Sequence, residues 1–258
     1  IKNVYYLDLN NTKKLENFFL KKKIDTLIHS AAMSNVDECE KYKKKCFMIN
    51  SELPIKISNL SQKCGIKFVF LSSDQLFSLN KNFKSENSTT NPINCYGKSK
   101  IKAENGILKN NNNALIIRTN FFGFGPLYRR SFSDWIIDNL RRNNRINLYE
   151  DIYFNPLFIK YLNTILIKLV SKNLKGIYNL SSDNKISKYH FGIKIAKNLN
   201  LNLNIIKKTK FNSRHHFANR PKNMCLNNSR IKKILNIKKI SIDDQIKKML
   251  KEVKNYEI

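Results

Sequence analysis

The apolar positions of this chain fall into short uninterrupted runs separated by longer amphipathic stretches. Four such runs, of four or five residues each, lie at residues 4–7, 26–29, 68–71 and 114–118. Runs of this kind are typical of strands in a parallel sheet that is covered on both faces. Because a stretch with helical spacing follows each of the first three, the pattern predicts a doubly wound α/β sheet of the Rossmann type.

The remaining periodicity places the helices and two later strands. Helices are expected at residues 12–22, 44–64, 96–109, 132–142, 158–170, 188–200 and 229–235, and strands at residues 146–149 and 177–180. Gly65 is expected to end the second helix and Pro54 to kink it. A last helix is expected after Ser241, which can cap it together with Asp244. The second half of the chain is therefore more helical than the first.

Charge and cysteine content narrow the class of protein. With 48 Lys and Arg against 19 Asp and Glu, the formal charge is +29, enough to raise the question of nucleic-acid binding. The basic residues are spread along the whole chain among many Asn and Ile, so a compositional bias is favoured and a nucleic-acid partner is not expected. The five Cys form no C-x-x-C pair, which argues for a reducing compartment. No metal-binding pattern, signal peptide or membrane-spanning apolar run is present, and we expect a soluble cytoplasmic protein.

One candidate for acid catalysis lies at the start of the helix expected at residues 96–109. Tyr96 and Lys100 are one turn apart on the same face, where the ammonium is expected to lower the phenol pKa. In so Lys-rich a chain this pair alone is a weak signal. Two other features are expected at the same edge of the sheet, where ligands of open parallel sheets bind. These are Ala31 with Ala32, and the run from Ser72 to Asp74.

The motifs around these residues resemble a known family. Ser72-Ser73-Asp74-Gln75-Leu76-Phe77 followed by Asn91-Pro92 and Tyr96-Gly97-Lys98-Ser99-Lys100 is similar to the extended short-chain dehydrogenase/reductases. The likeness is strongest to the dTDP-4-dehydrorhamnose reductase branch, which reads S-T-D-x-x-F and then N-P-x-x-x-Y-G-x-S-K. Matching segments at residues 30–40, 117–123, 176–191 and 220–229 occur in the same order, so the resemblance covers nearly the whole chain.

The resemblance implies an activity and a set of site residues. It implies reduction of a 4-keto nucleotide sugar by NADPH or NADH, in deoxysugar or cell-surface polysaccharide biosynthesis. Tyr96 would donate the proton, Lys100 would bind the nicotinamide ribose, and Ser73 would orient the carbonyl. The cofactor would be lined, besides Tyr96 and Lys100, by Asp8, Leu9, Ala31, Ala32, Met33, Asn50 and Ser72. The substrate would contact Ser73, Asp74, Asn120 and Phe121.

The same resemblance suggests how the chain is divided. Residues 1–121 would form an incomplete NAD(P)-binding part, and residues 122–258 mainly a substrate-binding part that adds the last strands of the sheet. A homodimer is left open as the assembly.

This chain also departs from the family pattern. Gln75 stands where the family usually has Tyr, and Phe121 where it has Trp, so the sugar pocket is expected to differ. No G-x-x-G-x-x-G is present in the 258 residues. We therefore expect a piece of a longer reductase or a truncated reading frame that binds NADPH weakly, with the strand at residues 4–7 unpaired and an open apolar edge at residues 26–29. An epimerase or dehydratase, and a non-catalytic nucleotide-binding or regulatory subunit, remain alternatives.

Overall fold

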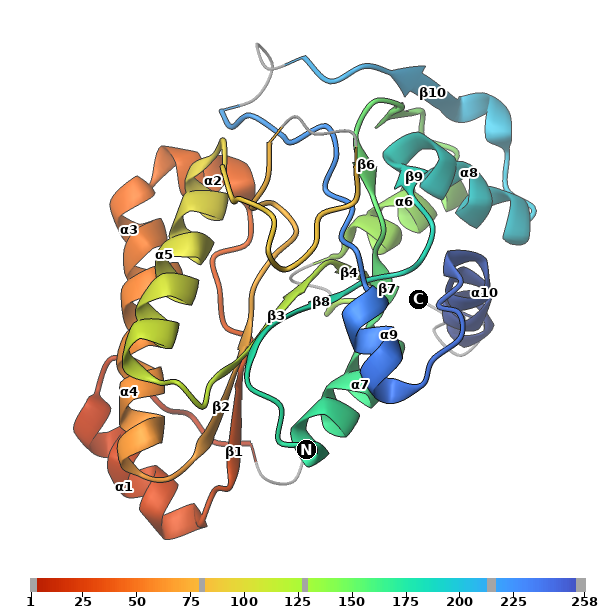
Figure 1. Ribbon diagram of the computed structural model, residues 1–258. Helices are drawn as coiled ribbons and strands as arrows, with labels where there is room; N and C mark the ends of the chain where they lie inside the picture. The colour runs from red at the N-terminus through yellow and green to blue at the C-terminus, as the bar shows by residue number, and fades with distance from the viewer. Residues whose placement is uncertain (1–3, 79–81, 127–129, 213–216, 254–258) are drawn as a thin grey trace.

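A four-stranded parallel sheet forms the centre of the computed structural model, which describes residues 4–78, 82–126, 130–212 and 217–253 (Figure 1). The strand order is β1-β2-β3-β8. The strands are β1 (Thr26–His29), β2 (Lys67–Leu71), β3 (Leu115–Thr119) and β8 (Gly176–Leu180). Each coincides within one or two residues with an apolar run, and the predicted doubly wound α/β fold is confirmed.

Helices cover both faces of this sheet. α1 (Thr12–Lys22), α4 (Leu53–Lys63) and α5 (Cys95–Asn110) pack on one face, against Phe68 and Phe70 of β2. α7 (Ile159–Ser171) and α9 (Ser229–Leu235) pack on the other, against Val69 of the same strand. Successive side chains of a strand point to opposite faces, so an uninterrupted apolar run is what two covered faces require.

A second part of the molecule lies beyond the carboxyl ends of the strands, at the upper right of Figure 1. Its core draws only on residues after 121 and joins α6, α8 and α10 to a parallel pair of strands, β5 and β10. The bounds are α6 (Phe132–Arg141), β5 (Ile146–Tyr149), α8 (Lys188–Asn198), β10 (Ile206–Thr209) and α10 (Ile242–Val253). Four two-residue strands make the pairs β4 (Phe121–Phe122) with β7 (Leu157–Phe158) and β6 (Tyr153–Phe154) with β9 (Ile186–Ser187). The division at residues 121 and 122 stays a prediction.

The prediction of a strand at residues 4–7 is wrong. The segment has no regular structure, and the side chain of Tyr6 is 99% exposed. A strand needs a neighbour to pair its N–H and C=O groups, and none of the described residues supplies one. By contrast, the expected open edge is confirmed within the described residues, because β1 pairs on one side only and Ile28 is 43% exposed.

The helix expected at residues 44–64 is three consecutive elements. They are α3 (Lys43–Phe47), a π-helical turn η1 (Met48–Glu52) and α4, and the short α2 (Val36–Lys41) precedes them. Pro54 lies in the first turn of α4, directly after the π-helical turn, and the kink expected there stays a prediction. Gly65 follows the last turn with φ +70, as expected for the residue that ends a helix.

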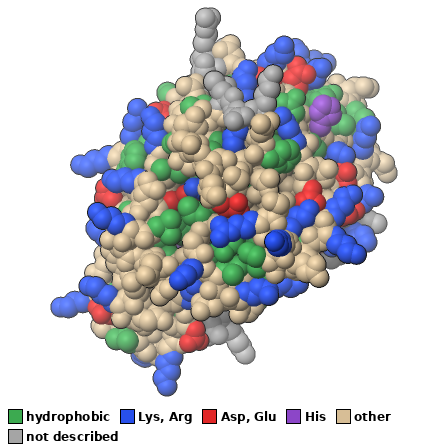
Figure 2. Space-filling model, viewed as in Figure 1, with side chains coloured by type: hydrophobic (Ala, Val, Ile, Leu, Met, Phe, Trp, Pro, Cys, Tyr) green, Lys and Arg blue, Asp and Glu red, His purple; other side chains and the backbone are tan. Residues whose placement is uncertain are grey.

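On the face that Figure 2 shows, the basic residues do not form one stripe. Figure 2 shows Lys and Arg side chains around the whole visible face, with Asp and Glu between them. The described part of the chain contains no helix that is both long and apolar enough to cross a membrane.

Candidate active site

The first turn of α5 is fixed by a side-chain cap and by close packing. Asn94 Oδ1 accepts the N–H of Gly97 at 2.8 Å, and Asn94 Nδ2 donates to the carbonyl of Asn219 at 2.9 Å. A Cβ on Gly97 would lie 2.3 Å from the carbonyl oxygen of Gln75, so only glycine lets the helix start this close to the β2 loop. Tyr96 is thereby held beside the residues that follow β2.

Ser73 and Asp74 meet Tyr96 at this point, as the sequence predicted. The Ser73 hydroxyl donates to Asp74 Oδ1 at 3.3 Å and lies close enough to the Tyr96 phenol to lower its pKa. Asn120 Nδ2 donates to Asp74 Oδ2 at 2.6 Å, which adds the residue after β3 to the group. Burial raises the pKa of Asp74 to about 6, while the Asn120 hydrogen bond and the charge of Lys188 oppose the rise.

The electrostatic role expected of Lys100 differs from what the structure shows. Burial is the largest cause and raises the pKa of Tyr96 well above its usual value; the Ser73 hydroxyl opposes that rise, and the nearby Asp74 adds to it. The Lys100 ammonium donates to the carbonyl of Leu71 at 2.8 Å and lies 4.3 Å from the centre of the Phe70 ring. Burial lowers the Lys100 pKa to about 8. The expected lowering of the Tyr96 pKa is therefore wrong for this arrangement.

A side-chain clamp fixes the loop after β1. Asn50, in the π-helical turn, accepts the N–H of Met33 at 2.8 Å and donates to the Met33 carbonyl at 2.9 Å. Both hydrogen-bonding groups of one peptide residue are thus held by one amide, and Ala31 and Ala32 precede it along the same loop. Pi-helical turns occur preferentially at functional sites, where they place one side chain out of helical register. The predicted cofactor residues Met33 and Asn50 are brought together.

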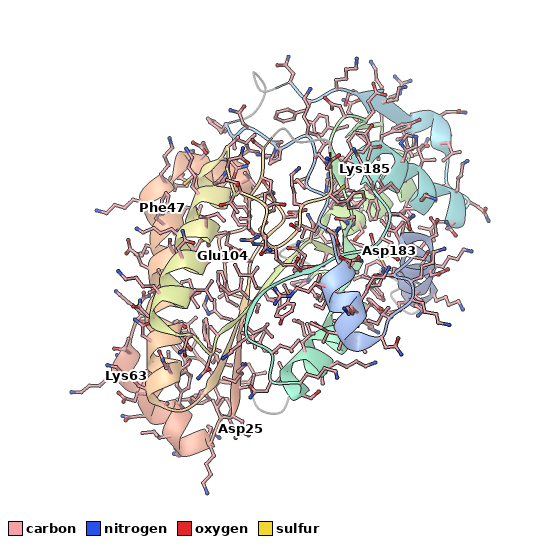
Figure 3. The ribbon with its side chains drawn as sticks, in the orientation of Figure 1. Asp25, Phe47, Lys63, Glu104, Asp183 and Lys185 are labelled. Atoms are coloured by element: carbon pink, nitrogen blue, oxygen red, sulfur yellow. The ribbon has the colours of Figure 1, made fainter. Side chains whose placement is uncertain are left out.

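Ser72 has a different environment from the one the resemblance implied. Its hydroxyl donates to Glu104 Oε1 at 2.5 Å, and the same carboxylate pairs with Arg118, whose Nη2 lies 2.6 Å from Oε2. Glu104 is labelled in Figure 3, on the face of α5 turned toward the sheet. Ser72 therefore ties β2 to α5 and β3, and its part in cofactor binding stays a prediction.

Three predicted residues make no described contact with this group. Asp8 is exposed, and its carboxylate accepts the N–H of Asn10 at 3.0 Å in a local turn before α1. Leu9 packs partly against the core under α1. Phe121 is 50% exposed in the short strand β4. The assignments of Asp8 and Leu9 to the cofactor and of Phe121 to the substrate stay predictions.

The structure also adds two residues that the sequence did not single out. Lys188, the first residue of α8, interacts electrostatically with Asp74, and its ammonium lies 3.4 Å from the centre of the Phe154 ring. Burial lowers the Lys188 pKa to about 8. His29, at the end of β1, is 5% exposed, and its Nε2 has no hydrogen-bond partner among the described residues. One Lys among 48 basic residues carries no sequence signal, but a His at the carboxyl end of a strand could have been noticed.

Together these groups can polarise a carbonyl and protonate it. A hydroxyl and a phenol in mutual contact, with a carboxylate and a buried ammonium beside them, form a proton donor with its orienting partners. The loop after β1 lies at the same edge of the sheet, because β1 and β2 are parallel.

Comparison with known proteins agrees with this geometry. The family model described as "RmlD substrate binding domain" matches residues 2–255. A probable low-salt glycan biosynthesis reductase of Haloferax volcanii is 23% identical over 94% of this chain and 82% of its own length. Methionine adenosyltransferase 2 subunit beta of Xenopus tropicalis is 26% identical over 76% of this chain, which spans only 61% of that protein.

A solved structure gives the same result for the fold. The dTDP-4-dehydrorhamnose reductase of Bacillus anthracis str. Ames, in complex with NADP, is 25% identical and superposes with a TM-score of 0.87. The match covers 95% of this chain and 87% of that one. The similarity therefore runs through both parts of the molecule and is not confined to the central sheet.

Proposed function

Because this chain belongs to the RmlD substrate binding domain family, we propose that it reduces a 4-keto nucleotide sugar with NADPH or NADH. The observation that carries the proposal is the contact between Ser73 and Tyr96 at the start of α5, with Lys100 one turn further on. The resemblance of the sequence motifs and the NADP complex of the Bacillus anthracis relative support the same reading.

The residues around the loop after β1 fit the nicotinamide end of such a cofactor. Asn50 fixes the backbone at Met33, and His29, at the end of β1, has a buried Nε2 with no partner among the described residues. The Lys100 ammonium has three N–H donors. One of them is hydrogen-bonded to the Leu71 carbonyl, and the other two can bind a ribose hydroxyl. We assign no residue of this chain to the pyrophosphate. When bound, the cofactor supplies the hydride.

The chain's own residues would then act on the sugar carbonyl. Ser73 would donate a hydrogen bond to the carbonyl oxygen and hold it beside the Tyr96 hydroxyl. As negative charge develops on that oxygen, Tyr96 would transfer its phenolic proton to it. Asp74, oriented by Asn120, would accept a hydrogen bond from a sugar hydroxyl and so fix the ring in the site.

The test is NADPH oxidation with dTDP-4-dehydrorhamnose by the protein and its Tyr96→Phe variant. We expect turnover to fall by about 10² or more, as for a lost general acid, because phenylalanine keeps the ring but has no proton to give. Tyr42→Phe is a matched control, since Tyr42 is 49% exposed and should leave turnover unchanged. An unaltered rate in Tyr96→Phe would remove Tyr96 from the mechanism.

A second candidate is a non-catalytic subunit of another enzyme. The similarity to a protein named as a methionine adenosyltransferase subunit favours it. The two candidates differ in a simple measurement, because a non-catalytic subunit would bind a nucleotide without oxidising NADPH in the presence of any keto sugar nucleotide. In that case Tyr96→Phe would leave nucleotide affinity unchanged and there would be no turnover to lose.

A further inference from the structure

Three cysteine side chains, from three different helices, pack together in a cluster that also contacts Tyr96. Cys39 of α2, Cys46 of α3 and Cys95 of α5 form one buried cluster, and Cys39 and Cys46 are fully enclosed. Phe47, labelled in Figure 3, packs against the cluster at the end of α3. The described residues contain no group of three or more His, Cys, Asp or Glu side chains that could hold a metal ion. We therefore do not interpret the three thiols as a metal site.

Asn50 connects the cluster to the candidate active site. Its Nδ2 lies 3.4 Å from Cys46 Sγ and 4.0 Å from Cys39 Sγ, while the same amide holds the Met33 carbonyl. Cys39 Sγ also lies 3.2 Å from that carbonyl oxygen, and Tyr96 packs on the cluster from the other side. Oxidation of these sulfurs would therefore alter the contacts of the loop after β1 and the packing of Tyr96.

The hydrogen-bond partners of Cys46 favour its thiolate form. Hydrogen bonding from Cys39, with smaller contributions from Ser99, Cys95 and Asn50, outweighs burial and lowers the pKa of Cys46 to about 6. The same contact raises the pKa of Cys39. Lys100 adds a positive charge that interacts with both sulfurs. A thiolate stabilised by donors and a nearby cation is the form of cysteine that reacts with oxidants.

We propose that Cys39 and Cys46 are an oxidation site for peroxides, and that their disulfide switches off the adjacent active site. The Cys46 thiolate attacks one oxygen of hydrogen peroxide, the O–O bond breaks, and the released hydroxide takes a proton to become water. The Cys39 thiol then attacks the resulting Cys46 sulfenic acid, an S–S bond forms and a second water leaves. Two thiols lose two electrons and two protons, and one peroxide is reduced to two waters.

A small neutral oxidant can reach the two sulfurs when α2, which carries Cys39, opens. α2 has six residues, and an isolated helix of that length has little stability of its own. Opening of this segment can therefore be local and leave the sheet intact. Once formed, the disulfide removes the thiolate that Asn50 contacts and pulls Cys39 away from the Met33 carbonyl, which loosens the clamp on the loop after β1.

The experiment treats the whole protein with hydrogen peroxide, blocks the remaining thiols by alkylation and maps the tryptic peptides without reduction. Lys41 and residues 43–45 are lysines, so trypsin separates Cys39 from Cys46 and only a disulfide can keep their peptides together. We expect that linked pair, its loss on treatment with dithiothreitol, and a parallel loss and recovery of NADPH oxidation. The disulfide is detected by the mass of the linked peptides, so this result does not depend on whether the proposed reduction of a keto sugar is correct.

Two variants sharpen the test. Cys39→Ser should leave a Cys46 sulfenic acid that a dimedone probe labels, whereas Cys64→Ser, at the end of α4 and outside the cluster, should leave the link unchanged. The peptide map of the wild-type protein shows by itself whether the Cys39–Cys46 disulfide forms, so the test does not depend on a variant that folds. Cys46 that stays alkylatable after peroxide treatment, or a link that joins Cys95 in place of Cys39, would overturn the proposal.

Discussion

Tyr96 is kept protonated by its surroundings across the neutral range. Burial raises its pKa, and nearby Asp74 adds to the effect, so the phenol holds its proton until a stronger base appears. The alkoxide that forms when a carbonyl accepts hydride is such a base. An acid of high pKa in a site with little water therefore fits donation late in the reaction, after charge has developed on the substrate oxygen.

Asp74 and Lys188 interact electrostatically in the site and titrate near neutral pH, and Lys100 is a third group with a pKa of about 8. The pKa values of Asp74 and Lys188, about 6 and about 8, are displaced toward each other by burial, and the attraction between the two charges opposes both displacements. Tyr96 stays protonated throughout this interval. If the ionised pair positions the sugar, kcat/KM should fall as pH drops through about 6 and as pH rises through about 8.

Lys188→Met tests that assignment by moving one limb of the profile. Without the ammonium the Asp74 carboxylate loses its stabilising charge, so the acid limb should shift to higher pH. A basic limb that remains near pH 8 in this variant belongs to Lys100, whose pKa is also about 8. The measurement is the pH dependence of kcat/KM for NADPH oxidation. Lys197→Met, on the exposed last turn of the same helix, is the control and should keep the original profile. An unshifted acid limb in Lys188→Met would show that the two groups do not interact during catalysis.

α5 carries the acid at its start and a buried ion pair in its middle. Glu104 and Arg118 are 1% and 4% exposed in their side chains, and Arg118 Nε lies 3.1 Å from each carboxylate oxygen. Ser72 and the carbonyl of Glu86 satisfy further groups of the pair. The helix is therefore anchored to β2 and β3 by hydrogen-bonded charge as well as by apolar packing.

Glu104→Gln should lower the free energy of unfolding by about 3–5 kcal/mol, because it leaves the Arg118 guanidinium buried without its counter-charge. Urea denaturation followed by circular dichroism measures the change. Glu52→Gln serves as the control, since its carboxylate is 3.8 Å from Lys102 at an exposed position, where a pair contributes about 0–1 kcal/mol. Equal losses in the two variants would contradict the anchoring role of Glu104.

The elements that were predictable from the sequence are those with a strong local signal. The strands at residues 26–29 and 68–71 coincide with predicted apolar runs, and α5 coincides with the helix expected at residues 96–109. The missed elements have no such signal. α2 spans fewer than two turns, the π-helical turn at Asn50 depends on neighbours in space, and β4, β6, β7 and β9 have two residues each. The prediction of a strand at residues 4–7 was wrong for the opposite reason. The local sequence favours a strand, but no other strand among the described residues lies beside it to pair with it.

The site shows the same division. The motif residues Ser73, Tyr96 and Asn50 could be named because their spacing resembles a family, and the contacts of Tyr96 with Ser73 and of Asn50 with Met33 are present. Lys188 could not be named, since it reaches Asp74 only through the packing of α8 against the second core. The direction of the Tyr96 pKa shift was also beyond the sequence, because desolvation depends on what encloses the ring.

At the scale of the whole molecule, the charge of +29 sets how anionic partners approach. A nucleotide sugar carries a negatively charged pyrophosphate, and a positive surface of mixed composition attracts it over distances of about one Debye length, roughly 10 Å at 0.1 M salt. Raising the salt from about 50 to about 500 mM should therefore increase KM for the nucleotide sugar several-fold. Turnover at saturation should stay constant, because the charges that act on the bound carbonyl are enclosed by protein.

Inhibition by DNA distinguishes general electrostatic attraction of the nucleotide sugar from specific recognition of nucleic acid. Basic residues spread over the surface give weak, strongly salt-dependent DNA binding, so duplex DNA should inhibit NADPH oxidation at about 50 mM salt and lose its effect near physiological ionic strength. DNA binding that persists at that ionic strength and is unaffected by sugar nucleotide would place a second, specific surface on the molecule. A KM that does not respond to salt would mean that the net charge contributes nothing to substrate capture, and that the site attracts its substrate through Lys188 and its neighbours alone.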